Sequence, residues 1–523
     1  MLLNLVILVA VVAFLWQQFF GRTSKYPKGP MPLPLVGNVH QVDTDIMKMV
    51  KTLDTFGRKY NGLYTIWLPG PTVVITDYEL MKEALVGNAE ALTGRPPQYL
   101  FELMFSGKYG IVLPDGHFWR EQRRFALHVL RDFGFGRNIM EDKINVELDR
   151  LVEHLNKQIQ DDTTKADGNG KRLNPRDALI VCVASIIGMV TFDHRYKFAG
   201  DQRLDMLVKM MHEMLEVFSS TPAQLLNFFP WLRYVPLYNH FGCDEVVKKM
   251  SPMIDFFREQ IAEHREQLDR CPEQEPSDYT NAYLQEMDRR KEKGESLGSF
   301  TEWQLFMAVG DIWGAGMETT VTTLRWVIRY MTMWPEVQEK AAAEIRKVIG
   351  PEKRVTMADR SELPYVQACV HEAQRMANVL PLNLLHETTA DIRVNGHFIP
   401  KGTAVIPQIY SVMRDERHFA APDEFRPERF ILGNDDDVDG GDIKLNQKLI
   451  DRVIPFSLGK RQCLGESLAR TELFLIMTTL LQKYRFKMTE EDRGKRHKEL
   501  MRTDRLAFTR RPQDFEILIS LRD

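Results

Sequence analysis

The stretch FSLGKRQCLG, residues 456–465, decides how this chain folds and what it can bind. A helical pattern follows it, from Glu466 to about Tyr484, so Cys463 is predicted to lie at the N-terminus of a helix. Backbone N–H groups and the helix dipole favour a thiolate at such a position. The cations Lys460 and Arg461 act in the same direction.

The residues around Cys463 limit the kinds of ligand that its thiolate can bind. Gly459 and Gly465 permit tight turns and close approach to a planar ligand. No His or Cys stands near Cys463 at zinc spacing, so its thiolate is predicted to form one axial bond to a metal held by other atoms, as in haem. A lone cysteine is more often a buried structural residue, and a cysteine hydrolase is a further reading, although no His stands out as its base. The ten-residue context favours the haem reading.

Composition excludes several classes of protein. The chain has 523 residues, of which 44% are hydrophobic and 27% charged, so the bulk of it is not intrinsically disordered. The formal net charge of -3 shows none of the basic excess typical of nucleic-acid binders. Five widely spaced cysteines predict neither a disulfide framework nor a structural zinc site. They are Cys182, Cys243, Cys271, Cys369 and Cys463.

The N-terminus predicts a membrane anchor. Residues 1–21 form an apolar run just long enough to span a hydrocarbon core of about 30 Å, and Lys and Arg appear only after it. The positive-inside rule therefore leaves the rest of the chain cytosolic. A cleaved signal peptide fits less well, because a charged start and a cleavage site are weak. Residues 22–38 are proline-rich and predict a stiff hinge, and residues 39–523 form the body.

Within the body, helical patterns dominate and β structure is minor. Residues 63–75 predict two strands around a Pro-Gly turn, and residues 393–406 predict a hairpin with an Asn-Gly turn. A helix of about 33 residues is predicted from a capping box at Ser299 or Thr301 to the stop at Pro335. Its middle contains three glycines, Gly310, Gly314 and Gly316, which indicate close approach of a flat group, a local opening of the helix or close helix packing.

Together these motifs closely resemble the cytochrome P-450 family of haem-thiolate monooxygenases. All five fixed positions of that family's Phe-x-x-Gly-x-Arg-x-Cys-x-Gly loop are met at residues 456–465. In the family's chain order, 119–123 match Trp-x-x-x-Arg, 315–319 match the oxygen-binding helix, 372–375 match Glu-x-x-Arg and 427–430 match Pro-Glu-Arg-Phe. The resemblance implies one mainly α domain of the cytochrome P-450 fold, preceded by a transmembrane helix.

The resemblance also implies roles for individual residues. Cys463 would be the axial ligand of the haem iron, and Arg123 would bind a propionate with Trp119 and Arg461 as partners. Glu372, Arg375 and Arg429 would lock the core behind the haem and are expected to be structural. The residues implied to bind haem b are Cys463, Arg461, Arg123, Trp119, His386, Phe456, Gly459 and Gly465.

Glu318 and Thr319 match the family's acid–alcohol pair. A carboxylate and a hydroxyl linked through water can relay the protons that dioxygen cleavage requires. Many relatives carry Asp where this chain carries Glu318.

The expected substrate pocket is apolar, as a lipophilic ligand requires. Each of its members could instead be a plain core residue, and the sequence LAFTRRP departs from the small-residue turn expected around Phe508. The pocket residues implied by the resemblance are Phe101, Phe105, Ile111, Val309, Ala315, Leu380, Leu384 and Phe508.

The activity implied is insertion of one atom of dioxygen into a lipophilic substrate, at the endoplasmic reticulum membrane. No dinucleotide fingerprint is present, so electrons are expected from an NADPH-dependent reductase that docks on a basic proximal face. That face would comprise Arg120, Arg124, Arg131, Lys444, Lys448, Arg452 and Lys460. Within the same fold, a reductase-independent isomerase or dehydratase acting on a peroxide is an alternative. A non-catalytic haem carrier or sensor is another.

Overall fold

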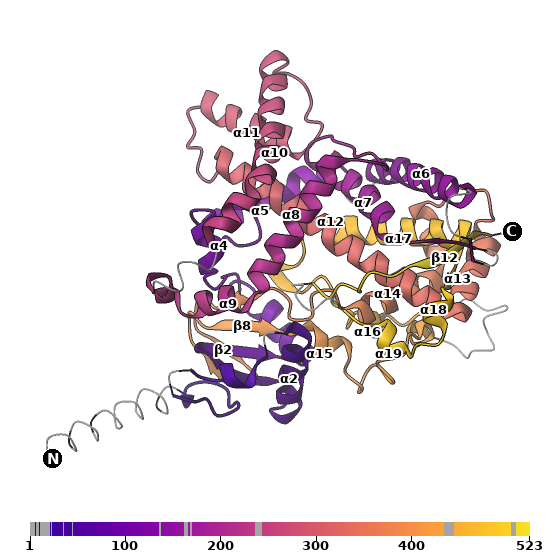
Figure 1. Ribbon diagram of the computed structural model, residues 1–523. Helices are drawn as coiled ribbons and strands as arrows, with labels where there is room; N and C mark the ends of the chain where they lie inside the picture. Colours follow the sequence, from indigo (N-terminus) through magenta and orange to yellow (C-terminus); the bar gives the residue numbers. More distant parts are fainter. Residues whose placement is uncertain are drawn as a thin grey trace.

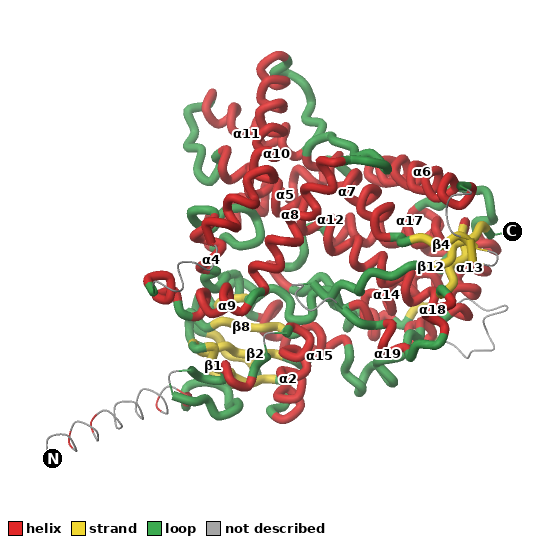
Figure 2. Tube along the Cα trace, in the orientation of Figure 1, coloured by secondary structure: helices red, strands yellow, loops and turns green. Residues whose placement is uncertain are grey.

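Helices dominate the computed structural model, and small sheets accompany them, as the sequence predicts (Figures 1 and 2). The structure describes residues 6, 10, 21, 23–34, 36–43, 45–134, 138–161, 166–167, 170–235, 243–432, 444–503 and 509–522.

The helices of the described residues vary from one turn to 32 residues in length. Their bounds are α2 Ile46–Lys59, α3 Tyr78–Lys82, α4 Tyr99–Met104, α5 Gly116–Asp132, α6 Asn138–Gln160, α7 Arg176–Thr191, α8 Gln202–Ser219, α9 Thr221–Phe228, α10 Cys243–Arg270, α11 Tyr279–Glu292, α12 Glu302–Met333, α13 Pro335–Val348, α14 Pro364–Ala377, α15 Ile409–Met413, α16 Gln447–Ile450, α17 Glu466–Lys483, α18 Glu490–Arg493 and α19 His497–Leu500. Shorter helical turns are η1 Val39–Gln41, η2 Glu83–Gly87, η3 Pro230–Tyr234, η4 Met357–Glu362, η5 Pro427–Phe430 and η7 Gly459–Arg461.

α12 is the long helix predicted from the sequence, and it crosses the middle of the molecule (Figure 1). The hydroxyl of Thr301 caps it by accepting from the Gln304 N–H at 3.1 Å, so the second of the two possible caps is used. α7, α10, α14 and α17 pack against it. Of the three glycines, Gly316 serves packing, since an added Cβ would lie 2.7 Å from Ile187 of α7.

The strands form two larger sheets at opposite sides of the helical body (Figures 1 and 2). One has the order β1-β2-β8-β5; β1 and β2 are the predicted antiparallel pair, in a register that places Leu63 opposite Ile75. The other has the order β11-β12-β4-β3, and β6 and β7 form the predicted hairpin. The strand bounds are β1 Leu63–Leu68, β2 Gly70–Ile75, β3 Ala166–Asp167, β4 Gly170–Leu173, β5 His386–Glu387, β6 Ile392–Val394, β7 His397–Ile399, β8 Ala404–Pro407, β9 Ile431–Leu432, β10 Lys444–Leu445, β11 Tyr484–Met488 and β12 Ile517–Leu521.

The proline-rich segment lies against β1. The Asn38 side chain accepts from the Trp67 N–H at 2.9 Å and donates to the Met31 carbonyl at 3.2 Å, which ties the segment to the strand. None of the described helices has the length and apolar character needed to cross a membrane. The predicted anchor, residues 1–21, falls almost wholly outside the described residues.

Glu372 and Arg375 of α14 form a buried ion pair rather than a surface one. Arg375 donates to both Glu372 oxygens, at 2.7 and 2.9 Å, and both side chains are inaccessible to solvent. The Arg429 Nε–H donates to Glu372 at 3.1 Å, so the three residues grouped by the resemblance do meet. Arg375 also donates to the carbonyls of Met413 and Pro422, which fastens the segment before η5 to α14.

Candidate active site

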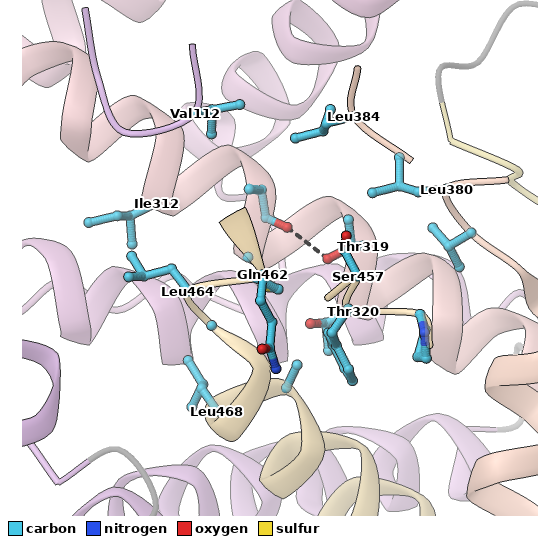
Figure 3. Close-up of a pocket in the computed structure, with 18 of the residues that line it drawn as sticks. Val112, Ile312, Thr319, Thr320, Leu380, Leu384, Ser457, Gln462, Leu464 and Leu468 are labelled. Carbon is cyan, nitrogen blue, oxygen red and sulfur yellow. Dashed lines mark hydrogen bonds between the residues drawn. The ribbon is translucent and has the colours of Figure 1, made fainter. Parts of the chain in front are cut away.

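A cavity of about 260 Å³ lies between the middle of α12 and the segment that leads into α17. Thr319 and Ile312 line it from α12, and Leu464 and Leu468 line it from the α17 side (Figure 3). Most of the remaining lining is apolar. The lining residues are Arg95, Ile111, Val112, Arg123, Leu130, Ile187, Asp311, Ile312, Ala315, Gly316, Thr319, Thr320, Thr323, Gln374, Val379, Leu380, Asn383, Leu384, Pro455, Phe456, Ser457, Arg461, Gln462, Cys463, Leu464, Gly465, Leu468, Ala469, Glu472 and Leu473.

Cys463 lies in this wall, three residues before α17. Its thiol is accessible because it lines the cavity, while protein surrounds its other sides. Burial raises the pKa of the thiol, although the Gly465 N–H and the Arg123 guanidinium oppose that rise. Lys460 was expected to favour the Cys463 thiolate, but it is exposed and pairs with Glu90 at 2.5 Å instead. A metal ion bound to the sulfur would reverse the effect of burial, since a coordinated thiol loses its proton.

The loop before Cys463 includes a position whose backbone angle favours glycine. Gly459 has a φ of +77°, and an added Cβ would lie 2.0 Å from the Leu85 carbonyl oxygen. The sequence predicted close approach of Gly459 to a planar ligand, but the close approach in the structure is to the backbone of η2. Phe456 lines the cavity and carries the Arg470 guanidinium over its ring, 5.0 Å from the centroid. The Cys463 N–H donates to the Phe456 carbonyl at 2.9 Å and closes the loop.

One end of the cavity carries three arginines. Arg461 donates to the Thr93 carbonyl, and its guanidinium lies 3.8 Å from the centroid of the Trp119 ring. Burial, together with Arg95 and Arg123, lowers the pKa of Arg461 to about 8. Burial and Arg123 likewise lower the pKa of Arg95 to about 10. Three cations crowded in a buried place create a site for negative charge.

Two donors at this end have no hydrogen-bond acceptor among the described residues. They are Arg461 Nη1 and the indole N–H of Trp119, both buried; Trp119 packs on the Arg461 guanidinium but lies outside the described lining of the cavity. Buried donors of native proteins are nearly always satisfied, so the unpaired Arg461 donor in the cavity wall indicates an acceptor, and its positive charge favours an acidic one. The residues therefore fit a haem, with Cys463 available to the iron and the Arg and Trp donors to the propionates.

His386, a further predicted propionate contact, is placed differently. It is buried in β5 and lies outside the described lining of the cavity, and its Nδ1 lies 2.7 Å from the Leu92 carbonyl. Burial and the nearby Arg95 lower the pKa of His386 to about 3, so its imidazole is neutral. It supports the arginine end through the Leu92 backbone.

Thr319 faces the cavity from α12 (Figure 3). Its hydroxyl donates to the carbonyl of Ala315 at 2.8 Å, one turn earlier. Ala315 and Gly316 line the same wall and have almost no side chain, so a small molecule can approach the hydroxyl. The thiol of Cys463 and the hydroxyl of Thr319 thus open onto one cavity from different elements.

Glu318 lies outside the described lining of the cavity. Its Oε2 is 3.1 Å from His212 Nε2, and its Oε1 accepts from the Thr509 hydroxyl at 3.1 Å. Burial raises the pKa of Glu318, but His212, Arg511 and Thr509 outweigh burial and hold that pKa below its usual value. The carboxylate is therefore charged at neutral pH.

The expected substrate residues divide into three groups. Ile111, Ala315, Leu380 and Leu384 line the cavity. Phe101, Phe105 and Val309 lie in the surrounding core, and the rings of Phe101 and Phe105 pack at 4.5 Å. Phe508 lies outside the described residues.

Asp311 was not singled out from the sequence. It lines the cavity from α12 and accepts the N–H groups of Ile111 and Val112, at 2.6 and 2.9 Å. Burial raises the pKa of Asp311 to about 6. An acidic residue among the apolar residues of the long helix is the sequence signal that could have found it.

Arg95 and Glu472 were missed for a different reason. Arg95 belongs to a loop far from the family motifs, and its guanidinium reaches the cavity only in the folded chain. Glu472 is buried in α17, where it accepts from Thr320 at 3.3 Å, and burial raises its pKa to about 8. Nothing in the local sequence distinguishes either residue from a surface charge.

Arg120, Arg124 and Arg131, three members of the predicted basic face, are exposed on α5. Part of its charge is neutralised locally, since Glu90 pairs with both Arg120 and Lys460.

Comparisons with known proteins agree with this geometry. The family model described as Cytochrome P450 matches residues 27–518. The chain is 36% identical to cytochrome P450 2J2 of Homo sapiens, over 92% of this chain and 90% of that protein. It is 35% identical to cytochrome P450 2C3 of Oryctolagus cuniculus, over 93% of each. It is 34% identical to the probable cytochrome P450 CYP36A1 of Caenorhabditis elegans, over 92% of this chain and 93% of that protein.

Proposed function

Because the chain belongs to the cytochrome P450 family of haem-thiolate monooxygenases, we propose that it inserts one atom of dioxygen into a lipophilic organic substrate such as a xenobiotic, a steroid or a fatty acid. One observation carries the proposal. The Cys463 thiol, the Thr319 hydroxyl and a cluster of buried arginines open onto a single, largely apolar cavity.

A haem b bound here, with the Cys463 sulfur as its thiolate ligand, would supply the activation of dioxygen. The residues that would hold the group are Cys463, by its sulfur, and Arg123, Arg461 and Trp119, whose N–H groups would donate to the propionates. Arg461 Nη1 and the Trp119 N–H, which are buried and without an acceptor in the described structure, support that role.

The substrate is expected on the α12 side of the cavity. Ile111, Ile312, Leu380 and Leu384 surround it with aliphatic side chains, and these exclude water from the reacting region. Thr319 offers a hydroxyl that can hold or pass a proton at its Oγ1 atom. Glu318 is the proposed source of that proton, although its carboxylate is directed to His212 in this structure.

The electrons are proposed to come from an NADPH-dependent reductase. The exposed arginines of α5 support a docking face for an acidic partner. We propose a membrane anchor at residues 1–21, a hinge at 22–38 and a cytosolic catalytic domain at 39–523, at the endoplasmic reticulum. The exposed apolar side chains of Met31 and Leu33 support a membrane-facing hinge.

A carbon monoxide difference spectrum of the reduced, detergent-solubilised protein tests the haem-thiolate site directly. A strongly red-shifted Soret band is expected, and a shorter-wavelength band would mean that the sulfur is not the ligand. Turnover of lipophilic substrates with and without reductase then tests the reaction. Reductase-independent conversion of a peroxide would replace monooxygenation with isomerase or dehydratase chemistry, and a spectrum without any turnover would indicate a haem carrier.

A further inference from the structure

A second, much smaller cavity lies where η4, α14 and α17 meet. Its volume is about 10 Å³, which is enough for one particle of roughly the size of a water molecule. Polar side chains make up more than half of its lining. The lining residues are Arg360, Gln367, Val370, His371, Arg470 and Phe474.

Positive charge dominates the lining of this small cavity. Arg360 and Arg470 each contribute a guanidinium, a group that stays charged in proteins. Arg470 has a carboxylate partner, because its Nε and Nη2 both lie 2.8 Å from Glu466 Oε1. No such partner of Arg360 is found among the residues that the structure describes. The two guanidinium groups therefore share one carboxylate, and a positive charge is left without a balancing acid.

The repulsion between these guanidinium groups is visible in the pKa of Arg360. Burial lowers that pKa, and the neighbouring Arg470 lowers it further, with no acid to oppose them. Asp359, the residue before Arg360, does not compensate, since it pairs with Lys353 at 2.9 Å. Cations gathered in a partly buried place make that place attractive to an anion.

His371 adds a hydrogen-bond donor to the same cavity. Its side chain on α14 is only 6% exposed, and its ring lies 5.9 Å from that of Phe430. Burial, together with Arg470 and Arg360, lowers the pKa of His371 to about 3, so the imidazole is neutral and offers one N–H. Within the described residues this ring makes no hydrogen bond. Buried polar groups of native proteins nearly always have a partner, so the cavity is expected to hold one.

We propose that Arg360, Arg470 and His371 bind one small inorganic anion of the size of chloride. The guanidinium groups balance its charge, and the imidazole N–H donates to it. A water molecule could accept the same hydrogen bonds but would leave the charge of Arg360 unbalanced. Sulfate and phosphate are larger than the cavity admits. The inference concerns a site apart from the candidate active site and does not depend on the proposed function.

The position of the site gives the anion a structural effect. Arg360 is half-buried, so an ion can reach the cavity from solvent on that side. Arg470 extends from the cavity towards the loop of Cys463, and its guanidinium lies 5.0 Å from the centroid of the Phe456 ring. The bound anion thus joins η4 to α14 and α17 beside that loop, and it stabilises the folded protein.

Chloride-dependent stability of the full-length, detergent-solubilised holoenzyme tests the proposal. The thermal midpoint is measured in potassium chloride and in potassium gluconate at the same ionic strength, because gluconate is too large for the cavity. A ligand that binds only the folded state stabilises it in proportion to the logarithm of its concentration over its dissociation constant. At a chloride concentration ten times that constant, the midpoint should rise by about 1–2 °C. Equal midpoints in the two salts would overturn the proposal.

Two arginine variants separate the site from a general effect of salt. Arg360→Gln removes one cation from the cavity and should abolish the rise caused by chloride. Arg354→Gln is the matched control, because Arg354 is exposed, pairs with Asp149 and lies outside the cavity lining. It should keep the rise of the wild type. A rise in Arg360→Gln as large as that of the wild type would assign the effect to the salt and overturn the proposal.

A direct measurement remains decisive if Arg360→Gln is unstable for other reasons. Bromide can take the place of chloride and scatters X-rays anomalously. Wild-type crystals soaked in bromide should show an anomalous peak between Arg360, Arg470 and His371. Crystals of Arg354→Gln should show the same peak. A cavity that holds only water in the wild-type crystals, with no anomalous signal, would overturn the proposal.

Discussion

Glu318 and Thr319 are consecutive residues of α12, but their side chains lie in different environments. Thr319 Oγ1 donates to the Ala315 carbonyl at the cavity wall, whereas Glu318 Oε2 lies 3.1 Å from His212 on α8. Successive residues of an α-helix are about 100° apart around the axis, so the two cannot share one face. Any proton passing between them has to cross the surface of the helix.

Thr319→Ala should leave the carbon monoxide spectrum intact and direct reducing equivalents to peroxide or water. The hydroxyl lies 2.8 Å from the Ala315 carbonyl at the small-residue wall, and alanine removes it without adding bulk. Product per NADPH is expected to fall at least about tenfold. Thr332→Ala, near the end of the same helix, should keep the wild-type ratio. Equal coupling in both variants would refute the role of Thr319.

Cys463→Ala should abolish the red-shifted band and all turnover, because no other thiol lines the described part of the cavity. Cys271 is exposed and lies outside that lining, so Cys271→Ala is the control and should preserve both. Persistence of the band in Cys463→Ala would assign the ligand elsewhere.

Arg461→Ala should weaken haem retention. Charge-assisted hydrogen bonds contribute about 1.5–3 kcal/mol, which corresponds to a loss of about 10- to 100-fold in affinity. Haem content per protein measures the effect. Arg461→Lys keeps the charge but lacks the planar fork and should recover retention only in part. Arg452→Ala removes an arginine that pairs with Glu79 at the surface, and should retain haem fully.

Glu372→Gln should destabilise the fold strongly. It leaves the buried guanidinium of Arg375 without its carboxylate and deprives Arg429 of an acceptor. Removing one partner of a buried pair costs about 3–5 kcal/mol. Denaturant unfolding should show that loss, while Glu266→Gln, in an exposed pair with Arg270, should cost less than about 1 kcal/mol. Equal costs would contradict the locking role of Glu372.

Asp311 should make stability depend on pH. Its pKa is about 6 in the folded protein against an ordinary 3.8, so the folded state binds the proton more tightly than the unfolded chain. The stabilisation is complete below about pH 4 and is lost as the pH rises to about 6, by about 3 kcal/mol. Unfolding of Asp311→Asn should lack this component between pH 4 and 6. A pH profile identical to that of the wild type would exclude it.

Local patterns were sufficient for much of the fold. Thr301 and Pro335 mark the two ends of α12, and the Pro-Gly and Asn-Gly turns identify two hairpins because the required backbone angles select these residues. The sheet β11-β12-β4-β3 was not anticipated. It joins residues 171–173 to 517–519, and no local signal encodes pairing over that separation.

Residues of the candidate site could be predicted from the sequence only where they belong to a family motif. Cys463, Arg461 and Arg123 belong to recognisable patterns, and they do line one cavity. Arg95, His212 and Asp311 belong to none, and their roles follow from neighbours distant in the chain. Phe105 and Val309 show the reverse case, since their apolar character suits a pocket and a core equally well.

The sequence by itself determined the class of chemistry, because a cysteine between two glycines ahead of a helix, with Arg461 beside it, constrains what the loop can bind. Tertiary structure decided which faces of α12 the polar groups occupy. Helical geometry sets Thr319 towards the cavity, and the packing of α8 supplies His212 to Glu318. The pKa of a buried carboxylate depends on partners brought from other elements, and those partners are known only once the chain is folded.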